Sequence, residues 1–221
     1  MIRSPTVVYA GPFLVFWALL ALSQILPFPA LAVQSGFVAI MAAVIVIVAR
    51  PALDLRVRHW VGTSLMGVAV FAIWIAPDQL FPGYRHWWIF ENTAMGKAQT
   101  GFSAEARGQA AVLWMRAIRS VVIVPVAEEL FWRGWLMRRL ISRRFDSIPL
   151  GTWSAPAFWI VALLFASEHG PYWDVGLAAG VVYNWWMVRT RSLGDLVAAH
   201  ALTNACLSVY VVWTGKWEYW L

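Results

Sequence analysis

Long runs of apolar residues, separated by short polar stretches, make up most of this chain. The first three runs cover residues 7–26, 30–49 and 60–76, and each is long enough to approach or cross a hydrocarbon core of about 30 Å. Proline marks the end of each run: Pro27 follows the first, Pro51 the second and Pro77 the third. The pattern therefore predicts three membrane-spanning helices at the start of the chain.

A polar stretch over residues 78–109 follows, where Gly, Pro, Arg, Glu and Asn alternate with aromatic residues, and it predicts an extramembrane loop with some interfacial helix. Beyond it lie four further apolar segments, at residues 110–140, 153–168, 175–188 and 196–214. We find no internal repeat. The chain is thus predicted to be all-α, a polytopic membrane helix bundle with about seven or eight transmembrane helices. Residues 1–221 form one integral membrane domain, divided into the spans of 1–77, the loop of 78–109 and the motif-bearing helices of 110–214.

Composition supports a membrane protein, because 61% of the residues are hydrophobic and 13% charged, whereas soluble domains are about half apolar and about a quarter charged. The net charge of +6 is then first a topology signal, and no nucleic-acid partner is expected. The single cysteine, Cys206, excludes an internal disulfide and a multi-cysteine metal site.

The basic residues divide unevenly between the two sides of the predicted bundle. One side receives Arg3, Arg50, Arg56, Arg58, Arg138, Arg139, Arg143, Arg144, Arg189 and Arg191. The other receives Arg85, Lys97, Arg107 and Lys216. The positive-inside rule then predicts a plasma-membrane protein of seven spans with a cytoplasmic N-terminus. An eighth inserted element in the long loop would reverse the side of the C-terminus.

Ionisable residues inside an apolar span cost roughly 2.5–3.5 kcal/mol each on insertion scales, so those in this chain need an explanation. Glu128, Glu129 and Arg133 follow Pro125, which predicts a kink. Adjacent helix residues point about 100° apart, so the two glutamates face different partners. Glu129 and Arg133 have the spacing of a helical ion pair, which leaves Glu128 for another role.

Two later segments also carry polar groups at helical spacing. Phe165 and His169 share one helix face, as do His200 and Asn204, and Glu168 is expected at the membrane interface. A structural interpretation is available for each, since ion pairs, histidines and asparagines often join helices. It explains poorly why all these costly residues occur in neighbouring segments.

Amide hydrolysis needs an activated water, a proton carrier and donors for the developing oxyanion. A carboxylate in an apolar site with an imidazole beside it can activate water, and His200 and Asn204 could donate to the oxyanion. We find no paired nucleophile, since Cys206 lies six residues after a histidine and Ser167 is merely adjacent to a motif. Direct attack by water therefore fits better than an acyl-enzyme.

Glu128-Glu129-x3-Arg133, Phe165-x3-His169 and His200-x3-Asn204, in this order, resemble the three motifs of the CPBP family of intramembrane proteases. That family includes type II CAAX prenyl endopeptidases and bacteriocin-processing or self-immunity proteins. The resemblance covers about residues 110–204, and the pattern is also similar to the CAAX-protease-related branch associated with exosortases. The insert at residues 149–156 and the long loop depart from the family pattern and bear on substrate access.

The resemblance implies that Glu128 and His169 activate water and that His200 and Asn204 form the oxyanion hole. Glu129 and Arg133 would support the site by orienting His169 or fixing the helix. The implied fold has a cavity between the motif helices, open towards cytoplasm or lipid.

The leading hypothesis is a glutamate-dependent intramembrane endopeptidase without cofactor or metal, acting on a membrane-associated protein or peptide. One alternative adds zinc held by Glu128, His169 and His200. Another is a non-catalytic membrane scaffold or self-immunity protein whose buried polar network only locks the helices.

Overall fold

The structure, a computed structural model, describes residues 4–220, and each predicted apolar segment contains a helix. The long helices are α1 (Pro5–Ser23), α2 (Ala30–Val44), α3 (Trp60–Leu80), a continuous helical run over Ala110–Arg139, α8 (Ala155–Ser167), α9 (Trp173–Thr190) and α10 (Leu193–Thr214). Within the described part of the chain no β-strand occurs. The prediction of an all-α membrane helix bundle is confirmed.

Within residues 4–220, five helical runs are long and apolar enough to cross a membrane by length and composition: Pro5–Ser23, Ala30–Ala52, Trp60–Leu80, Ala110–Arg139 and Leu193–Thr214. The predicted total of about seven or eight also counted α8 and α9. Helix α8 has 13 residues and extends about 20 Å, less than a full hydrocarbon core. Helix α9 carries Asp174, Asn184 and Arg189, which lower its hydropathy.

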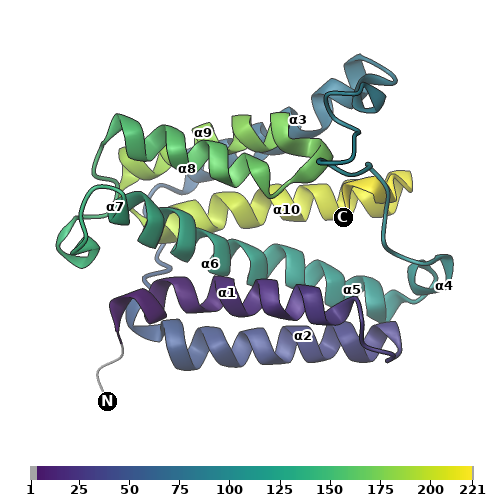
Figure 1. The fold of residues 1–221 in the computed structure, drawn as a ribbon, viewed down its shortest axis with the longest axis horizontal. Coiled ribbons are helices and arrows are strands. Elements are labelled where there is room, and N and C mark those ends of the chain that lie inside the picture. Colours follow the sequence, from purple (N-terminus) through teal and green to yellow (C-terminus); the bar gives the residue numbers. More distant parts are fainter. Residues whose placement is uncertain (1–3, 221) are drawn as a thin grey trace.

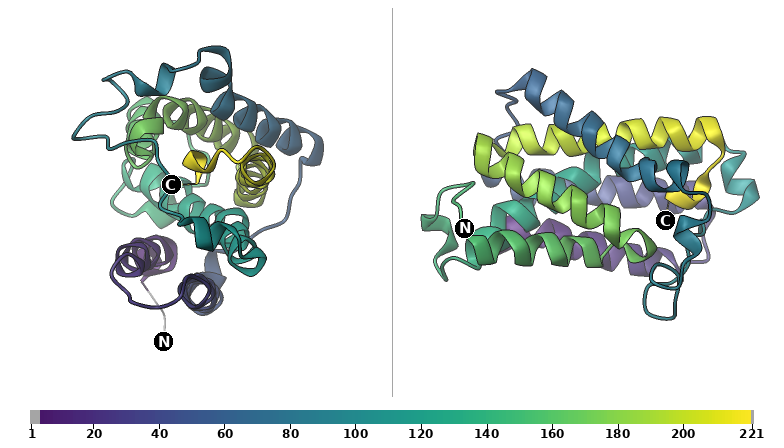
Figure 2. Two further views of the ribbon diagram at one scale, coloured as in Figure 1. Left: turned by 90° about the vertical axis from the view of Figure 1, so that its right-hand side faces the viewer. Right: turned by 90° about the horizontal axis from the view of Figure 1, so that it is seen from above.

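The helices pack in layers around the run Ala110–Arg139, which comprises α5, α6 and α7 with π-helical segments between them. Figure 1 shows α1 and α2 on one side of this run and α8, α9 and α3 on the other, with α10 beside it. The two further views agree with this arrangement (Figure 2). Helix α10 packs mainly against α3, and α8 against α9, so three motif-bearing helices surround the centre of the bundle.

Pro77 does not end the third helix as its position predicted. Helix α3 continues to Leu80, and the N–H of Phe81 donates to the carbonyl of Pro77 at 2.9 Å. Proline has no N–H to donate, so in the last turn it removes a single hydrogen bond to the preceding turn. The extra turn carries Asp78, whose carboxylate accepts hydrogen bonds from Arg85 and Tyr219.

The predicted extramembrane loop is mostly irregular between α3 and the long run, apart from a 3₁₀ turn at Tyr84–His86 and the short α4 (Ala104–Arg107). Its buried Arg85 joins Asp78 to Asp174 at the start of α9 and also donates to the carbonyl of Pro171 at 2.8 Å. One guanidinium therefore attaches the loop to α3 and to the connection between α8 and α9.

The loops rich in arginine lie together at the opposite end of the bundle, beside the start of α1 (Figures 1 and 2). Arg3 belongs to the predicted basic side but lies outside the described residues. At this end Asp195, fully buried, accepts hydrogen bonds from the backbone N–H of His59 at 2.8 Å and the hydroxyl of Thr63 at 2.8 Å. It also accepts from the N–H of Arg58 at 3.2 Å. Asp195 thus joins the first turns of α3 and α10.

We predict that Asp195→Ala lowers the free energy of unfolding by about 2–3 kcal/mol, because several donors lose a charged acceptor. Thermal unfolding in detergent measures the effect. Asp54→Ala is the matched control: its carboxylate is exposed and pairs with the exposed Arg56 and Arg58, so little change is expected. Equal midpoints for the two variants would contradict the role of Asp195.

Candidate active site

The helix that carries the two adjacent glutamates is irregular on both sides of them. Two π-helical segments, Arg119–Ile123 and Leu130–Leu136, flank the α-helical segment Val124–Glu129. The sequence predicted a kink at Pro125. The irregularity that the structure shows there is the π-helical segment that ends just before this proline. π-helical segments are rare in proteins, and those that do occur often lie at functional sites.

Glu129 and Arg133 form the predicted ion pair, and both side chains are fully buried. Nη1 of Arg133 lies 3.1 Å from each carboxylate oxygen of Glu129. Its Nε donates to Oδ1 of Asn184 at 2.7 Å and its Nη2 to the carbonyl of Gly180 at 3.3 Å. Nδ2 of Asn184 donates in turn to the carbonyl of Phe158 at 2.8 Å. The pair therefore fixes the long helical run against α9 and α8.

Of the two supporting roles that the resemblance implied for Glu129 and Arg133, the structure shows the fixing of the helix; the histidine that Glu129 contacts is His200 and not His169. Nδ1 of His200 lies 2.8 Å from Oε1 of Glu129. A carboxylate paired with arginine only accepts hydrogen bonds, so Nδ1 carries the hydrogen. His200 is the partner because α10 lies against this helical run at the level of Glu129, whereas His169 follows the end of α8.

His169 is held by its own helix. Its Nδ1 lies 2.7 Å from the carbonyl oxygen of Phe165, so this nitrogen donates and Nε2 remains available. The ring of Phe165 is 4.7 Å from the imidazole and that of Trp74 is 5.2 Å away, centroid to centroid. The predicted Phe165–His169 pair thus sets both the tautomer and the orientation of the imidazole.

Asn204 contacts a backbone group that the helix irregularity leaves open. The N–H of Val124 donates to the carbonyl of Arg119, and Pro125 has no N–H. The carbonyl of Ser120 therefore accepts from Nδ2 of Asn204, at 2.8 Å. An amide nitrogen carries two hydrogens, so Asn204 keeps one N–H for another acceptor.

Two carboxylates meet near the motif histidines. Glu128 is buried, and its Oε2 has no hydrogen-bond partner among the described residues. Glu168 is partly exposed and lines the same cavity, where Nε1 of Trp132 donates to its Oε1 at 3.0 Å. Its expected position at the membrane interface stays a prediction.

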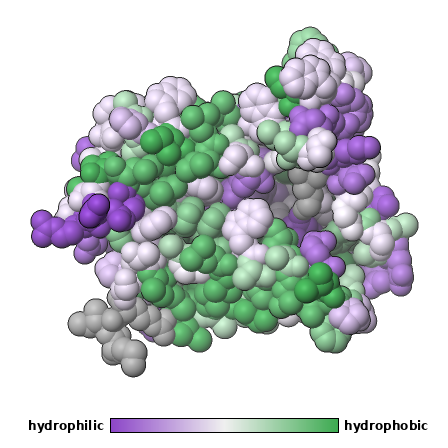
Figure 3. All heavy atoms as spheres, viewed as in Figure 1, coloured by the Kyte–Doolittle hydropathy of each residue, from purple (hydrophilic) through white to green (hydrophobic). Residues whose placement is uncertain are grey.

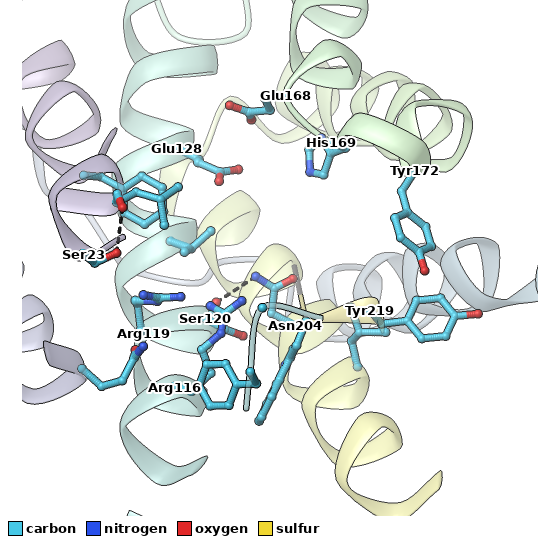
Figure 4. A pocket seen from close by; sticks show the side chains of 18 of the residues that line it. Ser23, Arg116, Arg119, Ser120, Glu128, Glu168, His169, Tyr172, Asn204 and Tyr219 are labelled. Carbon is cyan, nitrogen blue, oxygen red and sulfur yellow. Dashed lines mark hydrogen bonds between the residues drawn. The ribbon is translucent and has the colours of Figure 1, made fainter. Parts of the chain in front are cut away.

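One cavity of about 590 Å³ brings the predicted residues together. Its lining includes Glu128, Phe165, Glu168, His169, His200 and Asn204, together with Arg116 and Arg119. Figure 4 shows Glu128, Glu168 and His169 around one part of this pocket, with Asn204 and Ser120 next to them. Glu129 and Arg133 lie behind the cavity wall. On the face shown in Figure 3, a polar hollow separates two apolar areas.

Sequence reasoning missed Asn184, Ser120, Trp132 and the cavity position of Glu168. Asn184 had a signal, because a carboxamide inside an apolar segment needs a partner. The other three act through contacts between helices that no local spacing encodes. For the zinc alternative, residues 4–220 contain no group of three His, Cys, Asp or Glu side chains arranged to hold a metal ion.

Comparison with protein families gives a match for the part of the chain that carries the site. Residues 110–206 match the family described as type II CAAX prenyl endopeptidase Rce1-like. This stretch contains all three motifs, so the match confirms the resemblance that they indicated, and it supports a CAAX-type intramembrane endopeptidase in general. Searches of curated proteins and of solved structures give no significant match.

Substitutions of the two adjacent glutamates should change the free energy of unfolding by very different amounts. Glu129→Gln should lower the free energy of unfolding by about 3–5 kcal/mol, because it leaves the buried Arg133 without its counter-charge. Glu128→Gln should be neutral or stabilising, because Glu128 lacks a compensating partner. Thermal unfolding in one detergent checks both. A large loss of stability in Glu128→Gln would contradict this assignment.

Proposed function

We propose that the protein, whose residues 110–206 match the Rce1-like family, is a glutamate-dependent intramembrane endopeptidase in which Glu128 and His169 activate the attacking water. One observation carries the proposal. Oε2 of Glu128 is buried without a hydrogen-bond partner, and it lines the same cavity as two imidazoles whose Nδ1 atoms are already engaged. Oε2 of Glu128 is therefore available to accept a hydrogen bond from a ligand in the cavity.

In the first step the oxygen of a water molecule attacks the carbonyl carbon of the substrate while Glu128 accepts a proton from that water. Nε2 of His169 accepts the hydrogen bond from the second O–H and orients the water. The carbonyl π electrons move to oxygen, which forms the tetrahedral oxyanion. In the second step the C–N bond breaks as Glu128 returns the proton to the leaving amine.

His200 and Asn204 stabilise the oxyanion. Asn204 contributes the N–H that Ser120 does not use. His200 donates through Nε2 when both ring nitrogens carry hydrogen, since Nδ1–H is committed to Glu129. The Glu129 carboxylate holds the His200 ring in place through Nδ1–H, which gives the buried ion pair a function in the site as well as in the fold.

The scaffold alternative accounts for Glu129, Arg133 and Asn184, whose polar atoms are mutually satisfied. It does not account for Glu128, because an unpartnered buried carboxylate weakens a purely structural network. The endopeptidase assigns a role to both groups of residues, so it is the better explanation.

For the orientation in the membrane, we propose that the arginine-rich end of the bundle faces the cytoplasm. The arginines of residues 50–58, 138–144 and 189–191 support this orientation by the positive-inside rule. The substrate in this proposal is a membrane-associated protein or peptide.

We expect Glu128→Gln to lower kcat by about 10²–10⁴-fold, the usual contribution of a general base. Asn204→Ala should lower kcat by about 10²–10³-fold through loss of an oxyanion donor. Cleavage of a membrane-anchored peptide library, followed by mass spectrometry, measures both.

Glu105→Gln is the control, because Glu105 is exposed in the loop. If folded Glu128→Gln kept turnover within a few-fold of the unchanged protein, glutamate-dependent catalysis would be disproved.

A further inference from the structure

The loop that follows α3 carries a group of exposed apolar side chains, which we call the apolar tip. It consists of Leu80 in the last turn of α3 and of Phe81, Trp87, Trp88 and Ile89 in the loop. All five side chains are exposed, and Trp88 is the most exposed of the loop residues at 81%. Large apolar groups exposed in one short stretch of chain indicate a surface that interacts with a partner.

The side of the loop that faces the protein is held firmly. Arg85 is buried, and its guanidinium carbon lies 5.0 Å from the centre of the Phe90 ring, which is buried as well. Nε1 of Trp173 donates to the carbonyl of Ile89 at 3.2 Å, and the rings of Phe90 and Trp173 are stacked with centroids 5.8 Å apart. The exposed indoles therefore project from a fixed backbone, so binding through them needs little further ordering.

The apolar tip lies at the side of the bundle. Figure 1 shows the loop projecting sideways from the end of α3, next to the connection between α8 and α9, and the view from above in Figure 2 agrees. Exposed apolar residues also run along α3, among them Val61, Leu65 and Val68. The apolar tip is thus continuous with the outer surface of a helix that is long and apolar enough to span the membrane.

The length of α3 sets the level of the apolar tip relative to a bilayer. Its 21 residues extend about 31 Å, which matches a hydrocarbon core of about 30 Å. The loop that follows Leu80 therefore begins where hydrocarbon gives way to headgroups. Helix α8 starts at the same arginine-rich end and has 13 residues, so the connection after it ends short of this level and leaves the loop beside the bilayer.

The chemistry of the apolar tip suits the headgroup region better than the hydrocarbon core. An indole combines an apolar body with one N–H, and tryptophan is enriched where headgroups meet hydrocarbon. Residues 81–89 contain the 3₁₀ turn Tyr84–His86 and otherwise irregular backbone. Irregular backbone exposed to lipid does not occur in hydrocarbon, because its N–H and C=O groups need polar partners.

The charges near the apolar tip are already compensated. Nδ1 of His86 lies 3.1 Å from Oε2 of Glu91, and Oε1 of Glu91 accepts from the N–H of Ala98 at 3.0 Å. Arg85 is paired with two aspartates. A contact made by the apolar tip should therefore depend on its rings and not on the charge of the lipid.

We infer that the apolar tip binds the phospholipid headgroup region of the leaflet at this end of the bundle, with Trp87 and Trp88 as its main contacts. Residues 81–89 then touch the bilayer as a turn, where the sequence predicted an extramembrane loop with some interfacial helix. The inference does not depend on peptidase activity, so it would stand if the proposed function failed.

The test uses the full chain with Cys206→Ser in phosphatidylcholine nanodiscs, with a single new cysteine that carries the fluorophore NBD. The cysteine is placed by Trp88→Cys in the apolar tip, by Val68→Cys on the exposed face of α3, or by Glu105→Cys. Glu105 is the control, because it is exposed in α4, which lies beyond the end of α5 in Figure 1. Phospholipids with a spin label at the headgroup or in the middle of the acyl chain serve as quenchers.

The NBD group of Trp88→Cys should be quenched most by the headgroup spin label, that of Val68→Cys most by the acyl-chain spin label, and that of Glu105→Cys by neither. Emission from Trp88→Cys should also lie at shorter wavelength than emission from Glu105→Cys. Replacing phosphatidylcholine by phosphatidylglycerol should leave this order unchanged.

Three results would overturn the inference. The label of Trp88→Cys could behave like that of Glu105→Cys, or its quenching could require phosphatidylglycerol, which would make the contact electrostatic. Emission at short wavelength without quenching by either lipid would assign the apolar tip to a protein surface instead of the bilayer.

A second measurement tests the native indole without a fluorophore. Subtracting the tryptophan emission of Trp88→Phe from that of the unchanged protein leaves the contribution of Trp88. Phospholipids brominated close to the headgroup end of the acyl chain should quench this difference. The same subtraction with Trp186→Phe is the matched control, because Trp186 is buried in the bundle and should be quenched much less. Equal quenching of the two differences would contradict a contact between Trp88 and lipid.

Discussion

The carboxylate of Glu129 is the group on which the rest of the structure depends. It is fully buried, and it is shared between Arg133 on its own helix and His200 on α10. A buried charge is tolerated only when it is paired and hydrogen-bonded, so the helices that provide its partners have little freedom to move. Arg133 extends the same constraint through Asn184 to α9 and α8. One interaction thus sets the positions of four helices and aims an imidazole into the cavity.

The sequence predicted the features that are local to one segment. The apolar runs were predictable because the length of a spanning helix matches the thickness of the hydrocarbon core. The pairs Glu129–Arg133 and Phe165–His169 were predictable because a spacing of four residues places both side chains on one helix face. Contacts between helices were not predictable in this way, since the rotation of each helix about its axis is set by packing. The partner of His200, the contact of Asn204 with Ser120 and the cavity position of Glu168 all belong to this second group.

The end of the bundle next to the loop is held by a different set of charges. Arg85 joins the loop to α3 and α9, and Tyr219 donates to Asp78 from the C-terminal turn at 2.9 Å. These contacts close the bundle beside the cavity. They therefore position Tyr219 and Trp220, which line the cavity, without taking any group from its catalytic end.

The two π-helical segments around Val124–Glu129 affect how the chain can change in length. A π-helical turn holds more residues than an α-helical turn, so Leu130–Leu136 winds through less rotation than seven α-helical residues would. If the same residues wound as regular α-helix, Glu128 and Glu129 would turn by about 100° relative to the part of the helix that follows. The sequence would be unchanged, yet Glu129 could no longer face His200 while Arg138 kept its contact with the carbonyl of Ile148. The number of residues in this helix and its π-helical turns are therefore matched to each other, and a residue inserted or deleted here has to be absorbed by the gain or loss of such a turn.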